Sequence, residues 1–360
     1  MILLRKILYI ISLCCALLLG LTYIPAFIPQ DIFSKLSLLG YLYPFLLIIN
    51  AVFILIWLFV KPRHILIPLF FILIRFNYVP RLVNVHSSSE GGELKVMTYN
   101  VKDFIHKMEK RDAVLIGQRQ DSILAFIASS DPQVICLQDY DVNITWKKGF
   151  HNYLVDTFGY NHFYYYNIKR KNINNCAIYS KYPITQAGSV LPDDAKNYSY
   201  IFADIKTPVN TVRVYNLHLE SYKLGEQEKS DYTQIMHGKV SDTASKNIIN
   251  KLLTANKQRA KQIKEIIPEI ERQQKAVIVC GDFNDHPFSN TYKRFNDILT
   301  DAFVSCASGI GRTYNGVFPA YRIDYIWYEK SRLEAVNYAS EALDLSDHYP
   351  VTVTFNIKRQ

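Results

Sequence analysis

Long apolar stretches without charge occupy the first quarter of the chain. Ile7–Ile28 and Leu36–Val60 contain no charged residue, and each is long enough for a helix that crosses about 30 Å of hydrocarbon. Ile65–Val79 is shorter and contains Arg75, which near a helix end can extend to the interface. A cleaved signal peptide, the alternative for the first stretch, would not be followed at once by a second spanning stretch. We therefore expect residues 1–85 to form a membrane anchor of two or three transmembrane helices.

Basic residues flank these stretches and predict their orientation. If the first two helices form a hairpin, Arg5 and Lys6 lie on the same side of the membrane as Lys61, Arg63 and His64, and such basic flanks favour the cytoplasm. A third spanning helix then brings the rest of the chain out on the extracytoplasmic side. If the third stretch is only re-entrant, the rest of the chain faces the cytoplasm. We expect the first arrangement, a multi-pass integral membrane protein in contact with the lipid bilayer.

A polar segment, 86–93 (HSSSEGGE), is the expected linker to the second part of the chain. After it, short β-rich runs alternate with two segments whose apolar residues recur at helical spacing, 112–128 and 246–270. The runs expected to form strands are 94–99, 133–137, 176–179, 211–219, 275–280, 323–328 and 350–355. So many strands within about 270 residues favour a single α/β domain, residues 94–360, with a two-sheet core flanked by helices.

Composition and charge exclude two function classes. Hydrophobic residues make up 49% of the 360 and charged residues 20%, which excludes a largely disordered protein. The formal net charge is +9; the first 90 residues contain seven basic and two acidic side chains, which leaves 34 basic and 30 acidic residues for the rest. This near balance argues against a protein built mainly to coat nucleic acid.

Polar residues gather at or near the ends of the expected strands. The side chains that stand out are Asn100, Asp139, Asn216, His218, Asp282, Asn284, Asp324, Asp347 and His348. Each one alone is typical of a turn, but ligand-binding and catalytic groups of α/β folds collect where strands end. Asp324 lies inside an apolar strand, where a carboxylate needs a partner, and the imidazole of His348 is the best placed.

This set of side chains is typical of a site for a hard cation. Carboxylate and amide oxygens, without paired cysteines, suit Mg²⁺ or Mn²⁺ rather than Zn²⁺. A carboxylate-held cation close to two imidazoles and several amides is the outline of a phosphoester site. There the cation neutralises phosphate charge while a carboxylate positions the attacking water.

Seven segments in order resemble the endonuclease/exonuclease/phosphatase superfamily, which includes pancreatic deoxyribonuclease, abasic-site endonucleases, inositol-polyphosphate 5-phosphatases and neutral sphingomyelinases. They are MTYNV (97–101), DPQVICLQD (131–139), NNCAIYSKYPI (174–184), YNLHLES (215–221), VCGDFND (279–285), YRIDYIW (321–327) and LSDHYPV (345–351). The resemblance implies a deoxyribonuclease-like four-layer α/β/β/α sandwich with its site at one edge of the two sheets. It also implies a metal-dependent hydrolase that acts on phosphoester bonds.

The resemblance further implies a catalytic group made of Asn216, His218, Asp282, Asn284, Asp324 and His348. Asn216 and His218 match a pair that contacts phosphate. Asp282 matches the residue that orients or deprotonates the attacking water, and Asn284 matches its neighbouring contact to phosphate or water. The last two members of the group match the carboxylate and imidazole that pair with each other.

The metal ligands implied by the resemblance are Asp139, Asn100 and Asp347. Asn100 lies near the metal and the scissile phosphate, and Asp347 is linked to the metal or to a second cation. Two residues depart from the pattern of the superfamily. Asp139 stands where a longer Glu is usual, and Lys102 stands where several nucleases have an Asp. Both departures bear on the geometry of a metal site.

The expected function is therefore membrane-anchored, divalent-metal-dependent hydrolysis of a phosphodiester or phosphomonoester. The alternative, which the two departures motivate, is a catalytically impaired module on the same scaffold that binds phosphoesters or has a regulatory role. The sequence leaves the substrate open between nucleic acid and a phospholipid or its headgroup, and it indicates no obligate protein partner. The residues between His218 and Arg259 form an insertion that could cover the site.

Overall fold

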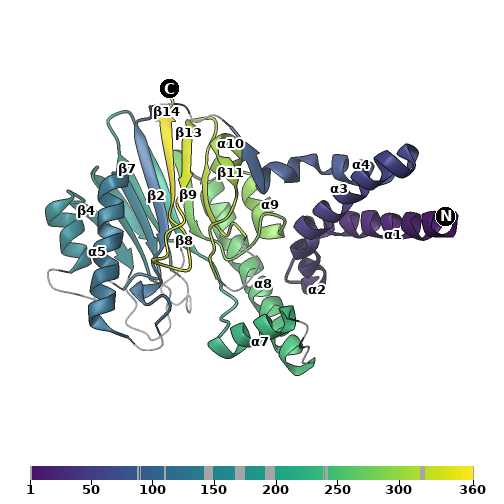
Figure 1. Cartoon of the computed structure of the whole chain (residues 1–360). Helices are drawn as coiled ribbons and strands as arrows, with labels where there is room; N and C mark the ends of the chain where they lie inside the picture. Colours follow the sequence, from purple (N-terminus) through teal and green to yellow (C-terminus); the bar gives the residue numbers. More distant parts are fainter. Residues whose placement is uncertain are drawn as a thin grey trace.

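The computed structural model describes residues 2–86, 89, 91–108, 111–141, 149–166, 175–190, 199–237, 239, 242–316 and 321–359. Figure 1 shows a sandwich of two sheets flanked by helices, with the N-terminal helices extending away from one side of it. The N-terminal helices therefore meet the sandwich along one of its sides.

Each of the two large sheets has six strands. The first has the order β13-β14-β2-β3-β5-β4 (Leu333–Ser340, Val351–Ile357, Leu94–Asn100, Val134–Gln138, Cys176–Ser180, His162–Tyr166). The second has the order β10-β12-β9-β8-β7-β6 (Thr300–Asp301, Asp324–Tyr328, Ala276–Asp282, Thr211–His218, Ser199–Lys206, Ile184–Ser189). One parallel pair lies inside each sheet, β2 with β3 and β8 with β9, and the other pairs are antiparallel. The carboxyl ends of each parallel pair therefore lie at one edge of its sheet.

Three apolar layers hold the sandwich together. Alternate residues of the strands, such as Val96 and Ile278, point between the sheets and form one buried cluster. On the outer face of the first sheet, Ile123 and Ile127 of α5 (Ala113–Ser130) belong to a second cluster. The third cluster joins the second sheet to α8 (Asp242–Glu271) and α9 (Asn290–Asn296). The expected four-layer α/β/β/α sandwich is confirmed.

All seven strands expected from the sequence are present as β2, β3, β5, β8, β9, β12 and β14, and both expected helices are present as α5 and α8. Of the five strands of the two large sheets that were not expected, β4, β6, β10 and β13 lie at sheet edges, and only β7 lies inside its sheet. Their solvent-facing positions carry mixed residues, as in the half-exposed ITQAGS of β6, so the alternation of apolar and polar residues is weak. The remaining short elements are η5 (Lys102–Phe104), α6 (Phe150–Asn152), η6 (Tyr153–Thr157), α7 (Glu226–Met236) and α10 (Ala302–Cys306).

The N-terminal part is helical. Its elements are α1 (Ile2–Leu21), η1 (Ile24–Ala26), α2 (Ser34–Ser37), η2 (Leu38–Leu42), α3 (Tyr43–Val60), η3 (Pro62–Ile65), α4 (Leu66–Ile74) and η4 (Phe76–Arg81). Two helical runs, Ile2–Ala26 and Ser34–Val60, are long and apolar enough to cross a membrane. The third expected stretch, Ile65–Val79, is not one helix, because α4 ends at Ile74 and a separate 3-10 turn follows.

The end of the first apolar stretch and the start of the second lie against the sandwich. Asn256 of α8 donates a hydrogen bond to Ser37 Oγ at 2.6 Å, and Asn290 donates to Ala26 O at 2.9 Å. β1 (Val83–Val85) pairs with β11 (Ser308–Ile310) in a small two-stranded sheet. Within the expected linker 86–93, residues 87, 88 and 90 lie outside the described part of the chain.

Candidate active site

The candidate site lies at the edge of the sandwich where the parallel strands of both sheets end. Asn100 and Gln138 close β2 and β3 and are paired in register. In the other sheet, His218 pairs with Asp282 across β8 and β9, and Asp282 pairs with Asp324 across β9 and β12. The register of these buried strands thus fixes the backbone positions of these residues, independently of their side-chain contacts.

Gly281 allows this edge to close. Its φ is +136°, a conformation that side chains of L-residues rarely adopt. A Cβ atom at this position would lie 1.9 Å from the carbonyl oxygen of Leu217 on β8. The glycine therefore lets β8 and β9 approach closely, and the next residue along β9 is Asp282.

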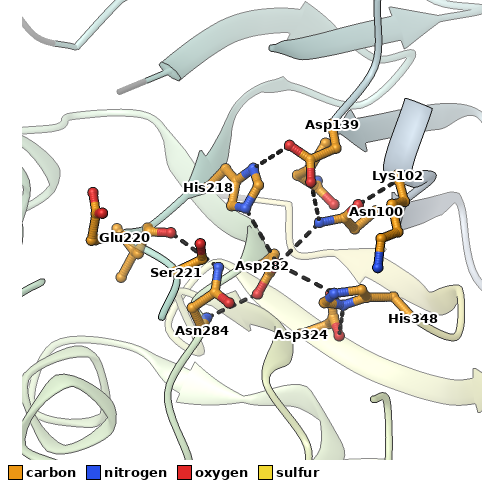
Figure 2. Close-up of polar contacts among 12 residues, drawn as sticks. Asn100, Lys102, Asp139, His218, Glu220, Ser221, Asp282, Asn284, Asp324 and His348 are labelled. Atoms are coloured by element: carbon orange, nitrogen blue, oxygen red, sulfur yellow. Dashed lines mark hydrogen bonds and ion pairs between the residues drawn. The ribbon is translucent and has the colours of Figure 1, made fainter. Parts of the chain in front are cut away.

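The Asp282 carboxylate is the centre of the polar cluster (Figure 2). Its Oδ2 accepts a hydrogen bond from Asn100 Nδ2 at 3.1 Å and lies 3.4 Å from His218 Nε2 and 3.6 Å from His348 Nε2. Its Oδ1 accepts from the backbone N–H of Asn284 at 2.8 Å. Burial raises the pKa of Asp282 above its ordinary value, while the two imidazoles oppose this rise.

The predicted pairing of Asp324 with His348 is present. The Nδ1 atom of His348 lies 3.0 and 3.1 Å from the two carboxylate oxygens of Asp324, and both residues are buried. Burial alone would lower the pKa of His348, but the Asp324 and Asp282 carboxylates outweigh it and raise this pKa to about 10. The imidazole therefore carries a proton at neutral pH and directs its second nitrogen towards Asp282.

Asp139 follows β3 and faces the cavity from the other sheet. Its φ of 45° turns the chain sharply at this point. The two carboxylate oxygens lie 3.4 Å from His218 Nδ1 and 3.4 Å from Asn100 Nδ2. One third of the side chain is exposed, whereas Asp282 is buried. Asp139 is therefore the carboxylate of this pair that remains open to a ligand.

Lys102 forms an ion pair with Asp347, so that two residues singled out from the sequence are partners. The backbone N–H of Lys102 also donates to Asn100 Oδ1 at 3.0 Å. Burial would raise the pKa of Asp347, but His348 and Lys102 outweigh it and lower this pKa. A lysine ammonium thus lies beside the carboxylate where the sequence predicted a metal ion or second cation.

Asn216 and Asn284 occupy different depths. Asn284 lies in the cavity wall and donates from Nδ2 to Leu219 O at 3.0 Å. Asn216 is fully buried and lies beneath the cavity rather than in its wall. It donates to Leu137 O and Ala177 O at 2.9 Å each, and it accepts from Gln138 Nε2 at 2.6 Å. Asn216 therefore ties the two sheets together under the site.

The cavity at this edge has a volume of about 260 Å³. Its polar end contains seven of the nine side chains predicted from the sequence: Asn100, Asp139, His218, Asp282, Asn284, Asp347 and His348. Asp324 lies behind His348, and Asn216 lies below. The other end is lined by residues that sequence reasoning missed: Tyr41, Tyr222, Leu224, His286, Tyr321 and Ile323. Of these, Tyr321 and Ile323 lie within the YRIDYIW segment, while Tyr222 and His286 directly follow the YNLHLES and VCGDFND segments. Tyr41 lies in no motif.

Two sets of donors in the described part of the site have the composition of a cation site. Asp282, Asp324 and His348 each place one donor atom within 4.8 Å of the other two. These three are buried and engaged with one another, whereas Asp139 faces the cavity with its carboxylate oxygens. Asn100 lies beside it and directs its Nδ2 at the Asp139 and Asp282 carboxylates, while its Oδ1 accepts from Lys102. Oxygen donors of this kind suit a hard divalent cation. The arrangement can hold such a cation next to a carboxylate flanked by two imidazoles.

Comparison with solved structures agrees with this fold. In solved structures, the human Nocturnin catalytic domain, with bound sulfate, has a TM-score of 0.51 at 16% identity and covers 76% of this chain and 98% of its own. A 3′ phosphatase, NExo, from Neisseria, bound to a product DNA hairpin, has a TM-score of 0.50 at 18% identity, covering 73% and 99%. An endonuclease/exonuclease/phosphatase protein from Beutenbergia cavernae has a TM-score of 0.51 at 16% identity, covering 74% and 72%. No curated protein matches the sequence.

Sequence profiles of protein families divide the chain in the same way as the fold. Residues 5–82 match a family described as a domain of unknown function. Residues 97–348, more than half of the chain, match the Endonuclease/Exonuclease/phosphatase family, whose members hydrolyse phosphoester bonds. The chain therefore belongs to the endonuclease/exonuclease/phosphatase family.

Proposed function

We propose that this chain is a divalent-metal-dependent phosphoesterase in which water attacks phosphorus in line with the bond that breaks. The observation that carries the proposal is the buried Asp282 carboxylate, with Asn100, His218 and His348 between 3.1 and 3.6 Å from one of its oxygens. A carboxylate held between two imidazoles at the wall of a cavity can orient a water molecule and take its proton.

Each residue then has a separate task in the hydrolysis. Asp282 orients the water and accepts its proton as the water oxygen bonds to phosphorus. His348, held by Asp324, binds a phosphoryl oxygen or gives a proton to the ester oxygen, which leaves with the electron pair of the broken P–O bond. His218 and Asn284 contact the phosphate, and Asn216 positions His218 from below.

The residues proposed to hold Mg²⁺ or Mn²⁺ are Asp139 and Asn100, with Asp347 beside them. Asp139 fits this role because its carboxylate is the acidic group exposed to the cavity on the side facing Asn100. A bound ion would neutralise charge on the phosphoryl oxygens. The ion pair of Asp347 with Lys102 supports one ion rather than two, because the ammonium already supplies a positive charge there.

A second candidate is a phosphoester-binding or regulatory module with impaired catalysis. Two observations favour it: Asp139 is shorter than the usual Glu, and Lys102 forms an ion pair with the carboxylate of Asp347. A metal site that shifts by a fraction of an ångström can lose its activity. Activity that rises steeply when Asp139 is lengthened to Glu would favour this candidate over the first.

The proposed organisation is a membrane anchor (1–85), a linker (86–93) and a catalytic domain (94–360). The arrangement of the helices supports a multi-pass anchor with the catalytic domain outside the cytoplasm. Figure 1 draws α1 with its N-terminus far from the sandwich, α3 leading away from the sandwich and α4 leading back. Arg5, Lys6, Lys61 and His64 line one hollow at the far end. Basic residues gathered at one end favour the cytoplasmic side for that end.

The proposed substrate is a phosphoester of nucleic acid or of a lipid headgroup. The test is a panel of plasmid DNA, RNA and lipid and small-molecule phosphoesters, offered to the full chain in detergent with Mg²⁺, Mn²⁺ or a chelator. Hydrolysis that needs the cation and disappears in His348→Ala supports the proposal. Hydrolysis that is equal in wild type and His348→Ala, or is unaffected by the chelator, contradicts it.

A further inference from the structure

The cavity contains a second, aromatic end that the hydrolysis itself does not use. Tyr41, Tyr222 and Tyr321 line it together with His286. Tyr222 follows β8 and contacts Arg259 of α8, so the insertion between His218 and Arg259 supplies one wall. Tyr41 belongs to η2 of the membrane anchor and supplies another.

Specific contacts fix Tyr41 against the catalytic domain. Its ring lies edge-on to His286 at 4.2 Å between centroids, and its hydroxyl contacts the hydroxyl of Tyr222. Its carbonyl oxygen accepts a hydrogen bond from Tyr321 Oη at 2.5 Å. The preceding Gly40 touches the same histidine, because a Cβ there would lie 2.5 Å from His286 Cε1. The anchor therefore contributes a fitted wall to the cavity.

An apolar groove adjoins this end of the cavity. It has a volume of about 260 Å³ and runs between the start of α3 and the small sheet of β1 and β11. Its lining is Pro44, Phe45, Leu82, Val83, Ile310, Gly311 and Tyr321. Tyr321 lines both the groove and the cavity, so the two hollows adjoin at this side chain.

The groove opens where the molecule presents apolar side chains to its surroundings. Phe45, on the first turns of α3, is 50% exposed, Ile310 is 77% exposed and Val85 is 84% exposed. From Phe45 onwards, α3 continues as the long apolar helix that leads away from the sandwich. Exposed apolar residues that are continuous with a spanning helix are typical of a surface that meets a bilayer.

These observations point to one occupant. We propose that the substrate is a membrane lipid with a phosphoester headgroup. The phosphate binds at the polar end, and the apolar part passes Tyr41 and Tyr321 into the groove between α3 and β11. This inference rests on the proposed phosphoesterase function and assigns its substrate class. A nucleic acid offers no apolar chain for such a groove, and the lysines that line the cavity, Lys102, Lys223 and Lys229, suit the phosphate of either substrate.

The experiment compares two substrates on the full chain in mixed micelles of a non-ionic detergent. One is a lipid phosphoester, taken from phosphatidylglycerol, sphingomyelin and a phosphatidylinositol phosphate, and the other is soluble bis(para-nitrophenyl) phosphate. The variants are Ile310→Lys in the groove, Tyr41→Ala and Tyr41→Phe in the wall, and Val114→Lys as control. Val114 is an exposed apolar residue on α5, on the other side of the sandwich.

We expect the ratio of lipid to soluble turnover to fall by about tenfold or more in Ile310→Lys and Tyr41→Ala, because an apolar contact is worth about 10–200-fold. Val114→Lys should match wild type, and Tyr41→Phe should lose less than Tyr41→Ala. An unchanged ratio in both variants overturns the inference, as does a wild type that cleaves the soluble ester or DNA but none of the lipids. If wild type cleaves nothing with either cation, the phosphoesterase proposal itself fails, and the inference fails with it.

Discussion

The two ends of the cavity are built in different ways. At the polar end, Asn100, His218 and Asp282 extend from buried strands, and the register of the sheets fixes their positions. At the aromatic end, Tyr41 and Tyr222 come from a 3-10 turn of the N-terminal helical part and from a loop after β8, and ring packing and hydroxyl contacts hold them. The proposed hydrolysis thus belongs to the rigid scaffold, and the proposed choice of substrate belongs to segments that can vary without altering that scaffold.

Replacing the central carboxylate of the polar end should have the largest effect. Asp282→Asn keeps the shape and the hydrogen bond from the backbone of Asn284, but it removes the negative charge between the imidazoles. We expect kcat on a soluble phosphodiester to fall by about 10²–10⁴-fold, which is typical for loss of a general base. Steady-state kinetics checks this, with thermal unfolding as the control for folding. A fall of less than threefold would mean that the polar end is not the reactive one.

Acid should weaken the aromatic end. Burial, reinforced by Arg259, lowers the pKa of His286 to about 4, while an unfolded chain has the ordinary value near 6.5. As pH falls from 6.5 to 4, the unfolded state takes up a proton that the folded state does not. The free energy of unfolding should therefore decrease by up to about 3 kcal/mol as pH falls through that window. Above pH 6.5 the contribution of His286 to this free energy should not change with pH.

The measurement is the midpoint of thermal unfolding of the full chain between pH 4 and pH 7.5. His286→Gln should flatten the acid side of this curve. His237→Gln, at an exposed histidine after α7, should leave the curve as in wild type. If the midpoint falls equally steeply with acid in wild type and in His286→Gln, the loss of stability in acid does not come from protonation of this imidazole.

Uncoupling His348 from its partner should have an intermediate effect. In Asp324→Asn, the imidazole loses the foremost of the three carboxylates, Asp324, Asp282 and Asp347, that raise its pKa to about 10. A group with a raised pKa keeps its proton below that value and loses it as pH rises. The alkaline limb of the pH–rate profile should therefore move to lower pH, and kcat should fall by about tenfold to a hundredfold. A lower kcat with an unmoved alkaline limb would contradict the role of His348 as a proton-bearing group.

Lengthening the exposed carboxylate should have the smallest effect. Asp139 already places its oxygens 3.4 Å from His218 and Asn100, so an added methylene in Asp139→Glu forces the group to shift. We expect kcat to fall a few-fold and the Mg²⁺ concentration that gives half-maximal activity to rise a few-fold, about 1 kcal/mol for each change. A tenfold gain would instead favour the impaired module, in which the shorter side chain limits activity.

Sequence reasoning identified the polar end because strands carry their own signals. The alternating or continuous apolar runs before Asn100 and Asp282 predicted where the strands end, and both side chains lie at that edge. The depth of each side chain could not be predicted. Asn216 and His218 have the same spacing along β8 as any pair on one face, yet the approach of the first sheet buries Asn216 completely.

The aromatic end could not be predicted, because Tyr41 lies in an apolar stretch whose composition is that of a membrane helix. Its contact with His286 joins residues 245 positions apart, and only the packing of η2 against the sandwich brings them together. The ion pair of Lys102 with Asp347 is a similar case: both residues were noted separately, but their partnership depends on loops that meet in space.

The most direct test of the proposed reaction is metal-dependent hydrolysis of bis(para-nitrophenyl) phosphate by the full chain, measured beside His348→Ala. We expect turnover with Mg²⁺ or Mn²⁺, no turnover with a chelator, and a loss of about a hundredfold or more in the variant. Equal rates in wild type and His348→Ala, or no turnover by wild type with either cation on this ester and on the lipid and nucleic-acid substrates, would contradict a phosphoesterase site at the edge of the two sheets.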